Sequence, residues 1–189
     1  MSYRVFVAAE PDELNAHQQS VSDALHDLGM STVEPATASL ASRQYFEASL
    51  LGVRGADLFL GIYGTHYGEI LPDQELSHTE LIYNEALDLK LPCFVYLIDP
   101  QQSWVVEHVE GDTEGAMQRI FLDRLQSENP NFRYFTSSRD LAHKVAFDLA
   151  RYKSEKAGEH SYNRRHFLIG MLILWLVLLI VALRMGPIG

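Results

Sequence analysis

Two short segments carry side chains whose types and spacing could form a ligand site. The first, residues 64–68, reads Gly-Thr-His-Tyr-Gly and places a hydroxyl, an imidazole and a phenol between two glycines. Glycines permit close approach of the backbone to a ligand. No GK[ST] ending or complete GxGxxG accompanies them, so the segment is neither a Walker motif nor a dinucleotide fingerprint. Its spacing fits a ligand loop and an ordinary turn equally well.

The second segment, residues 77–80, reads Ser-His-Thr-Glu. A serine followed three residues later by a glutamate is the capping-box pattern, so spacing alone favours a structural cap for Glu80. The functional alternative is a carboxylate in the first turn of a helix. There it could stabilise a developing cation or attack an anomeric carbon, as in glycosyl transfer.

Other catalytic chemistries find no support in the sequence. His66 and His78 are not accompanied by an HExxH or CxxC pattern or by a third ligand at suitable spacing, so we expect no metal site. No GxSxG elbow occurs, which argues against a serine hydrolase. Cys93 is the single cysteine, so no intramolecular disulfide can form.

The elements that must position these segments alternate along the chain. Apolar runs predict strands at residues 3–8, 31–35, 57–63 and 93–98, and helical spacing predicts helices at 12–28, 45–53 and 77–90. A last helix is marked by Leu141, Val145, Leu149 and Tyr152. This alternation predicts one α/β domain over residues 1–152, a flavodoxin-like doubly wound parallel sheet.

Such a sheet predicts where a site would lie. Parallel sheets place their sites outside the carboxyl ends of the strands, where residues 8–13, 64–68 and 99–103 should meet. We therefore expect a small-molecule site formed by the loop at residues 64–68 and the start of the next helix at residues 77–80. Glu80 is the candidate catalytic residue, and the candidate ligand-binding residues are Gly64, His66, Tyr67, Gly68, Ser77, Thr79 and Tyr83.

Charge is divided unevenly along the chain. Residues 1–150 hold 9 Lys and Arg against 23 Asp and Glu, a net charge of −14, whereas residues 151–189 hold 6 against 2, a net of +4. An acidic body repels a phosphate backbone, so we expect no nucleic-acid partner.

The C-terminal region predicts a membrane anchor. A polar and basic linker at residues 153–166 leads to a helix at 167–184 and a short tail at 185–189, and the run from Phe167 to Leu183 contains no charged side chain. Seventeen residues of helix span roughly 26 Å, which nearly matches a bilayer core. Basic residues before the run predict a single-pass membrane protein with a cytosolic N-terminal domain and the lipid bilayer as a partner. Self-association through this helix has no motif to support it.

Several motifs together resemble a known family. They are Arg4-Val5-Phe6-Val7, Ala56-Asp57, Gly64-x-x-Tyr67-Gly68, Ser77-x-Thr79-Glu80-x-x-Tyr83-x-x-Ala86, Pro92, and Phe135-x-Ser137-x-x-Asp140-Leu141. From about residue 3 to residue 150 the chain resembles the domain-of-unknown-function family 4062. That family is related in fold to TIR domains and nucleoside deoxyribosyltransferases.

The resemblance implies a TIR-like signalling domain that binds a nucleotide or a protein partner, in stress or defence signalling, and the apolar C-terminal run would tether it to a membrane. No cofactor is required, and NAD or a related nucleotide is the expected ligand. One alternative is an NAD or nucleoside glycosidase using Glu80, with Tyr67 and Ser77 positioning the ribose. Another is an effector whose helix perturbs the bilayer.

The chain departs from the family pattern in two places. After the first strand it has Ala8-Ala9 in place of small hydroxyl residues, and the first helix has His17-Gln18 where the family has Glu-Arg. Loss of that arginine removes a cation that could hold a phosphate. Ile82 occupies a second position that is often acidic in the family. If related glycosidases place their essential carboxylate at that second position, this chain is catalytically inactive; if Glu80 is the equivalent residue, the chain can be active.

Overall fold

The computed structural model describes residues 2–9, 11–33, 42–101, 113–129, 131–158 and 171. The chain divides into two compact units, Met1–Ala146 and Phe147–Gly189. The described part of the second unit is helical. The first unit contains the sheet and the candidate site.

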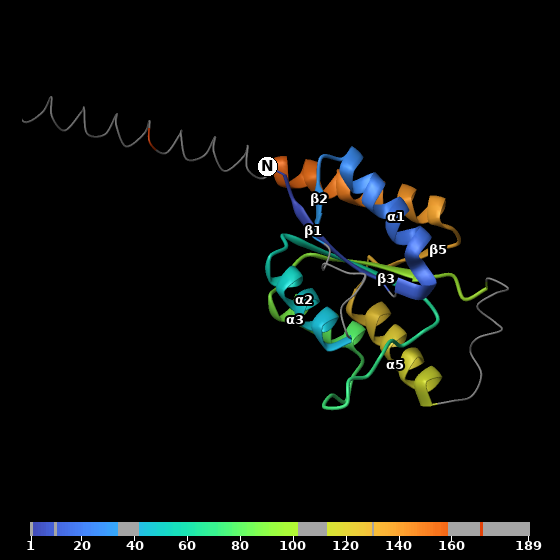
Figure 1. Ribbon diagram of the computed structural model, residues 1–189. Helices are drawn as coiled ribbons and strands as arrows, with labels where there is room; N and C mark the ends of the chain where they lie inside the picture. Colours follow the sequence, from blue (N-terminus) through green and yellow to red (C-terminus); the bar gives the residue numbers. More distant parts are fainter. Residues whose placement is uncertain are drawn as a thin grey trace, which may run out of the picture. The chain divides into compact units, whose positions relative to one another are not determined.

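Five parallel strands form one sheet (Figure 1). They are β1 (Arg4–Ala9), β2 (Ser31–Val33), β3 (Leu58–Tyr63), β4 (Cys93–Ile98) and β5 (Arg133–Phe135). Their spatial order is β2-β1-β3-β4-β5, the order of flavodoxin-like folds. The predicted fold class of the domain is therefore confirmed.

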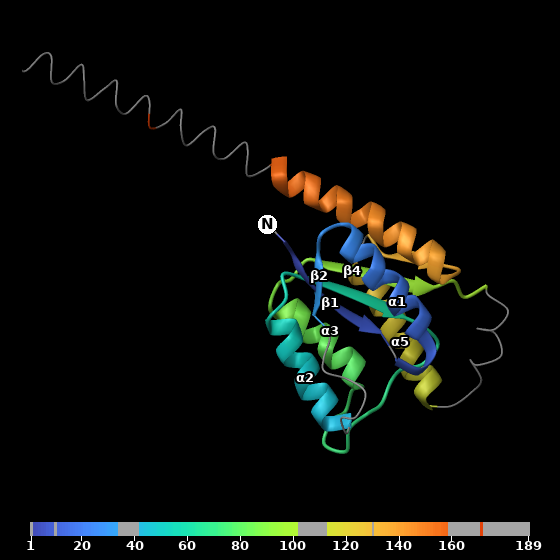
Figure 2. The ribbon, with the colours of Figure 1, turned by 45° about the horizontal axis from the view of Figure 1, so that its top comes forward.

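Helices cover both faces of this sheet. α1 (Pro11–Asp27) lies on one face, and α2 (Ser42–Arg54), α3 (His78–Asp88) and α5 (Thr113–Glu128) lie on the other (Figure 2). Residues 138–158 are also helical, so the helix predicted from Leu141 onward includes the first residues of the predicted linker.

The core follows the alternation of side chains along each strand. Phe6, Phe59, Val95 and Leu97 pack with residues of α2, α3 and α5 in one buried cluster. Their neighbours along the strands point to the opposite face and are also buried: Val5, Val7, Leu58, Leu60, Ile62 and Tyr96. Strands buried on both faces read as continuous apolar runs, which is why the sequence identified β1, β3 and β4.

Two helices end in the same way with different residues. After α1, Gly29 adopts a φ of 67°, and after α3, Lys90 adopts a φ of 56°. In both turns the next residue donates a backbone hydrogen bond to a carbonyl five residues back, Met30 to Leu25 and Leu91 to Ala86. This is the Schellman motif, which favours glycine at the left-handed position.

One helix and one strand of the first unit were not predicted from the sequence. α5 and β5 follow β4 in the chain, and their sequence signals are weak: β5 has three residues, and the inward face of α5 includes the polar Gln118. Among the described residues, no helix combines the length and apolar character needed to cross a bilayer. Except for Met171, the predicted membrane run at 167–184 lies outside the described residues, as does the tail at 185–189.

Candidate functional site

The loop after β3 folds back so that it meets the start of α3. Gly68 provides the turn with a φ of 89°, a conformation that side chains other than glycine rarely adopt. Ile70 then pairs with Ser77 in an isolated antiparallel bridge, and the backbone N–H of His78 donates to the carbonyl of Glu69 at 2.9 Å. Residues 64–68 and 77–80 are thereby brought together at the carboxyl end of the central strand.

Ser77 begins α3 as its N-cap. Its backbone is extended, and its hydroxyl accepts a hydrogen bond of 3.3 Å from the backbone N–H of Glu80. The expected serine cap is present. The carboxylate of Glu80 makes its contacts elsewhere, with Tyr67 and Arg124.

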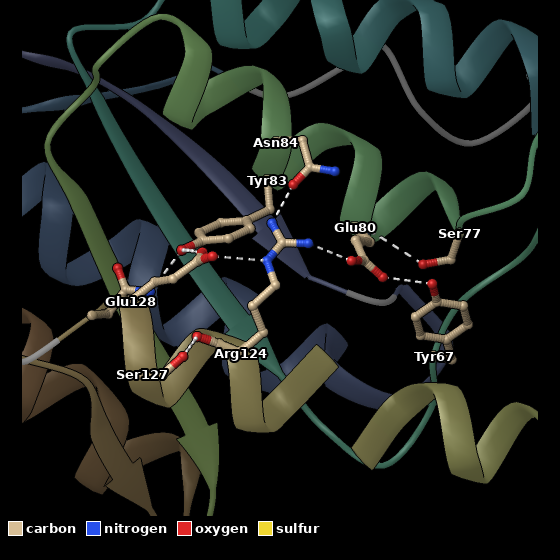
Figure 3. Close-up of polar contacts among 9 residues, drawn as sticks. Tyr67, Ser77, Glu80, Tyr83, Asn84, Arg124, Ser127 and Glu128 are labelled. Carbon is tan, nitrogen blue, oxygen red and sulfur yellow. Dashed lines mark hydrogen bonds and ion pairs between the residues drawn. The ribbon is translucent and has the colours of Figure 1, made fainter. Parts of the chain in front are cut away.

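The contact between Tyr67 and Glu80 is short and buried (Figure 3). The phenol donates to Oε2 of Glu80 at 2.5 Å, and only 3% of Tyr67 and 7% of Glu80 are exposed. Burial, and then the hydrogen bond to Glu80, raise the pKa of Tyr67 from 10.0 to about 12. Tyr67 is therefore a stable hydrogen-bond donor throughout the physiological range.

Arg124 of α5 compensates the charge of Glu80. Its Nη1 donates to Oε1 of Glu80 at 2.5 Å and its Nε donates to Oε1 of Glu128 at 3.1 Å. Its Nη2 donates to Oδ1 of Asn84, which is one turn after Glu80 on the same face of α3. The guanidinium also lies 5.4 Å from the centre of the Tyr83 ring. All three nitrogens of Arg124 are therefore engaged within the protein.

Tyr83 extends the network to the end of α5. Its hydroxyl donates to Oε2 of Glu128 at 3.2 Å and accepts from the amide of Asn129 at 2.7 Å. Burial raises the pKa of Tyr83 to about 12 against the opposing effect of the Asn129 hydrogen bond, and the Glu128 carboxylate also raises it. Tyr83 and Tyr67 thus lie on opposite sides of the pair formed by Glu80 and Arg124 (Figure 3).

α5 also holds the loop after β3 directly. The amide of Gln118 is 4% exposed and donates a hydrogen bond of 2.8 Å to the carbonyl of Gly64. One turn later, the ring of Phe121 lies edge-on to Tyr63 at 5.3 Å and to Tyr67 at 6.2 Å. A single face of α5 therefore positions both the loop and the carboxylate of Glu80.

The predicted site residues occupy three kinds of position. Tyr67, Ser77 and Glu80 come together, and Gly64 and Gly68 shape the loop beside them. Thr79 and Tyr83 are buried, with Tyr83 directed toward α5. His66 is exposed, and its Nδ1 lies 3.3 Å from the Thr65 hydroxyl. The predicted edge segments also include Glu10, Gln102 and Ser103, which lie outside the described residues.

The sequence did not identify four residues that contact the site: Asn84, Gln118, Arg124 and Glu128. Arg124 is 44 residues from Glu80 and Gln118 is 54 residues from Gly64, so no local motif joins these pairs. Two weak signals existed: Asn84 follows Glu80 by four residues in a predicted helix, and Glu128 follows Arg124 by four.

This arrangement can recognise hydrogen-bond donors. A carboxylate has about four lone-pair positions, so Glu80 retains acceptor capacity beyond its bonds to Tyr67 and Arg124. In dinucleotide-binding α/β folds, an acidic side chain at this edge of the sheet accepts a hydrogen bond from a ribose hydroxyl. Within the ranges described above, no group of three or more His, Cys, Asp and Glu side chains could hold a metal ion.

Comparison with known proteins gives the family and two structural similarities. The profile of DUF4062, described as a domain of unknown function, matches residues 4–150. A comparison of the sequence with curated proteins found no match.

Two solved structures are similar at low identity. Clostridium botulinum CMP N-glycosidase, BcmB, has 15% identity and a TM-score of 0.45, with 78% of this chain and 98% of that chain covered. The TIR domains of the activated Roq1 resistosome, which directly recognises the pathogen effector XopQ, have 12% identity and a TM-score of 0.43, with 77% and 82% covered. Because the DUF4062 profile spans most of the sequence, the chain belongs to the DUF4062 family.

Proposed function

We propose that this chain is a membrane-tethered, TIR-like signalling domain that binds a ribose-containing nucleoside or nucleotide beside Tyr67 and Glu80. One observation carries the proposal: a carboxylate is held at the carboxyl edge of the sheet by the phenol of Tyr67 and the guanidinium of Arg124. Its remaining lone pairs suit the vicinal hydroxyls of a ribose.

The position of Glu80 supports binding more strongly than a purely structural role. α3 already has its N-cap in Ser77, so the helix start does not require a carboxylate three residues later. Burying a carboxylate costs free energy, and here three separate elements contribute to its compensation: the loop, α3 and α5. The compensated carboxylate lies at the edge of the sheet where ligands bind in this class of fold.

A binding experiment tests this proposal. Full-length protein in a non-ionic detergent is titrated with adenosine, cytidine, AMP, CMP and NAD, and heat is recorded by calorimetry. We expect at least one of these probes to bind, and we expect Glu80→Gln to weaken that binding roughly tenfold or more because an amide loses a charged acceptor. Glu75→Gln makes the same chemical change at an exposed position of the same loop and should leave the affinity for the uncharged probes, adenosine and cytidine, unchanged.

Two results would contradict the binding proposal. One is the absence of heat for every probe. The other is an equal loss of affinity in Glu80→Gln and Glu75→Gln, which would place the ligand elsewhere.

The second candidate function is an N-glycosidase. In that reaction the bond between the sugar and the base breaks, water adds to the sugar carbon and the base takes a proton, while the Glu80 carboxylate stabilises or attacks the anomeric carbon. The 2.5 Å bond from Tyr67 favours this reading because it fixes the carboxylate in one orientation. Chromatography of free base after incubation with each probe detects it, and Glu80→Gln should abolish the release.

The membrane part of the proposal rests on the apolar run from Phe167 to Leu183 and the basic residues Arg164 and Arg165 before it. Full-length protein should remain with membranes after a high-salt wash. A chain without residues 163–189 should be released from the membranes. The double variant Leu174→Arg/Leu178→Arg should be released as well, because each arginine costs roughly 3 kcal/mol at the centre of a membrane span. A truncated chain that still sediments with membranes would contradict the anchor.

A further inference from the structure

Lysine and arginine are missing from the sequence segments that follow the three central strands. No such residue occurs between Arg4 and Arg43, between Arg54 and Lys90, or between Lys90 and Arg119. These gaps contain the segments after β1, β3 and β4, where a parallel sheet forms its site. The segments that directly follow β1, β3 and β4 therefore offer no lysine or arginine to a ligand bound at this edge.

The same segments are rich in acidic residues. Residues 10–13, 64–77 and 99–114 contain three, three and five acidic residues. Among those with a described position, Glu69 and Glu75 are exposed in the loop after β3, and Glu114 is exposed in the first turn of α5. This edge consequently carries a negative potential that repels anions.

Four of the nine lysines and arginines in residues 1–150 stand at the opposite edge. Arg4 begins β1, Arg54 ends α2 just before β3, Lys90 precedes β4, and Arg133 begins β5. All four stand at the amino ends of parallel strands, away from the carboxyl edge that bears Tyr67 and Glu80.

Two arginines on the site side are engaged with carboxylates, a third follows an outer strand, and Arg119 is exposed in the first half of α5. Arg124 donates from all three nitrogens to Glu80, Asn84 and Glu128. Arg43, at the start of α2, pairs with Asp73 at 2.5 Å. Arg139 follows β5, the strand at the outer edge of the sheet. A phosphate that approached Arg124 or Arg43 would have to compete with a carboxylate that already binds that arginine.

From the lack of lysine and arginine in the acidic segments after the central strands, we infer that the site selects nucleosides without a phosphate over their phosphate esters. The inference rests on the proposed function and narrows its substrate class. A 5′-phosphate brings nearly two negative charges to an edge that offers acceptors and carboxylates, whereas the hydroxyls of a free nucleoside are donors that Glu80 can accept. Arginine and lysine are the side chains that bind phosphates in proteins, and neither occurs in the segments that directly follow the central strands.

The test compares matched probe pairs on the full-length protein in a non-ionic detergent. Calorimetry gives Kd values for adenosine against AMP and for cytidine against CMP at about 0.01 M ionic strength, where the Debye length is about 30 Å. We expect the nucleoside to bind roughly tenfold more tightly than its monophosphate, a gap that narrows at about 1 M salt because the repulsion is screened.

Two charge-reversing variants make the test local. Glu69→Lys places a cation at an exposed residue whose carbonyl accepts from His78 at the start of α3. Asp88→Lys makes the same change in net charge at the exposed last residue of α3, about 15 Å further along the helix. We expect Glu69→Lys to reduce the ratio of the monophosphate Kd to the nucleoside Kd roughly threefold, and we expect Asp88→Lys to leave this ratio unchanged.

Three outcomes would overturn the inference. A monophosphate that binds as tightly as its nucleoside, or more tightly, contradicts it while the proposed binding function survives. Equal effects of Glu69→Lys and Asp88→Lys would reduce the selectivity to overall charge and contradict a local cause. Absence of binding by every probe would contradict the proposed function itself, and the inference with it.

Discussion

The phenol of Tyr67 donates a hydrogen bond of 2.5 Å to the carboxylate of Glu80, although Tyr67 belongs to the loop after β3 and Glu80 to the first turn of α3. This contact ties the two chemically informative segments of the sequence to each other. Arg124 approaches the same carboxylate from α5, so three elements converge on one buried charge. The predictions below test what each partner contributes.

Tyr67→Phe should lower the free energy of unfolding by roughly 1.5–3 kcal/mol, because a buried carboxylate loses a charge-assisted hydrogen bond. Urea unfolding of the full-length protein in a non-ionic detergent measures the change. Tyr134→Phe removes an exposed hydroxyl that donates to Gln126 at 3.2 Å and should cost less than about 0.5 kcal/mol. Equal costs for the two variants would show that Tyr67 does not support the Glu80 carboxylate.

Alkaline pH should weaken the fold through its buried tyrosines. The pKa values of Tyr67 and Tyr83 are raised from 10.0 to about 12 in the folded state, so the folded protein holds these protons more tightly than the unfolded chain. The stabilisation is fully present below pH 10 and is lost as pH rises from 10 through about 12. Urea unfolding at a series of pH values should show this decline, and Tyr67→Phe should make it shallower. A decline that is identical in the variant would contradict the raised pKa of Tyr67.

Arg124→Gln should destabilise the protein by about 2 kcal/mol, because it leaves the Glu80 carboxylate buried without its cation. Arg124 is itself 29% exposed, which keeps the cost below that of a fully buried pair. Arg43→Gln is the control, since its pair with Asp73 has both side chains more than half exposed and should contribute less than about 1 kcal/mol. Equal losses in the free energy of unfolding for the two substitutions would show that the pair of Arg124 with Glu80 contributes no more than an exposed ion pair.

Lys90→Gly should stabilise the protein by about 0.5–1 kcal/mol, because glycine adopts a positive φ without the steric cost that lysine carries. The equivalent turn after α1 provides the reverse experiment, in which Gly29→Lys should destabilise by about 1 kcal/mol. Thermal unfolding of both variants measures the pair of changes. Opposite signs are expected, and stabilisation by both would contradict the common turn geometry.

Much of the fold could be predicted from the sequence because the central strands are buried on both faces. β1, β3 and β4 read as unbroken apolar runs, and β4 was predicted with its observed limits, Cys93–Ile98. β5 has three residues, of which Phe135 alone is buried, so it leaves no recognisable run. The inward face of α5 includes polar Gln118 beside Phe121 and Leu125, which weakens its apolar stripe.

The candidate site could be predicted only where its contacts are local. Tyr67 and Glu80 are 13 residues apart and lie in segments that share a strand-to-helix connection, so topology alone brings them together. Arg124 reaches Glu80 only because α5 packs beside α3 on the same face of the sheet. Residue spacing gives no register between two such helices, and the network of Arg124, Asn84 and Glu128 therefore required the structure.

The central claim is that a ribose-containing ligand binds where Tyr67 and Glu80 meet. Hydrogen–deuterium exchange of the full-length protein, with and without the tightest-binding nucleoside at saturation, locates that ligand most directly. We predict that protection is concentrated in residues 64–80 and around Arg124, and that Glu80→Gln removes it. Protection confined to other segments, such as the amino-terminal ends of the strands near Arg4 and Lys90, would contradict the account.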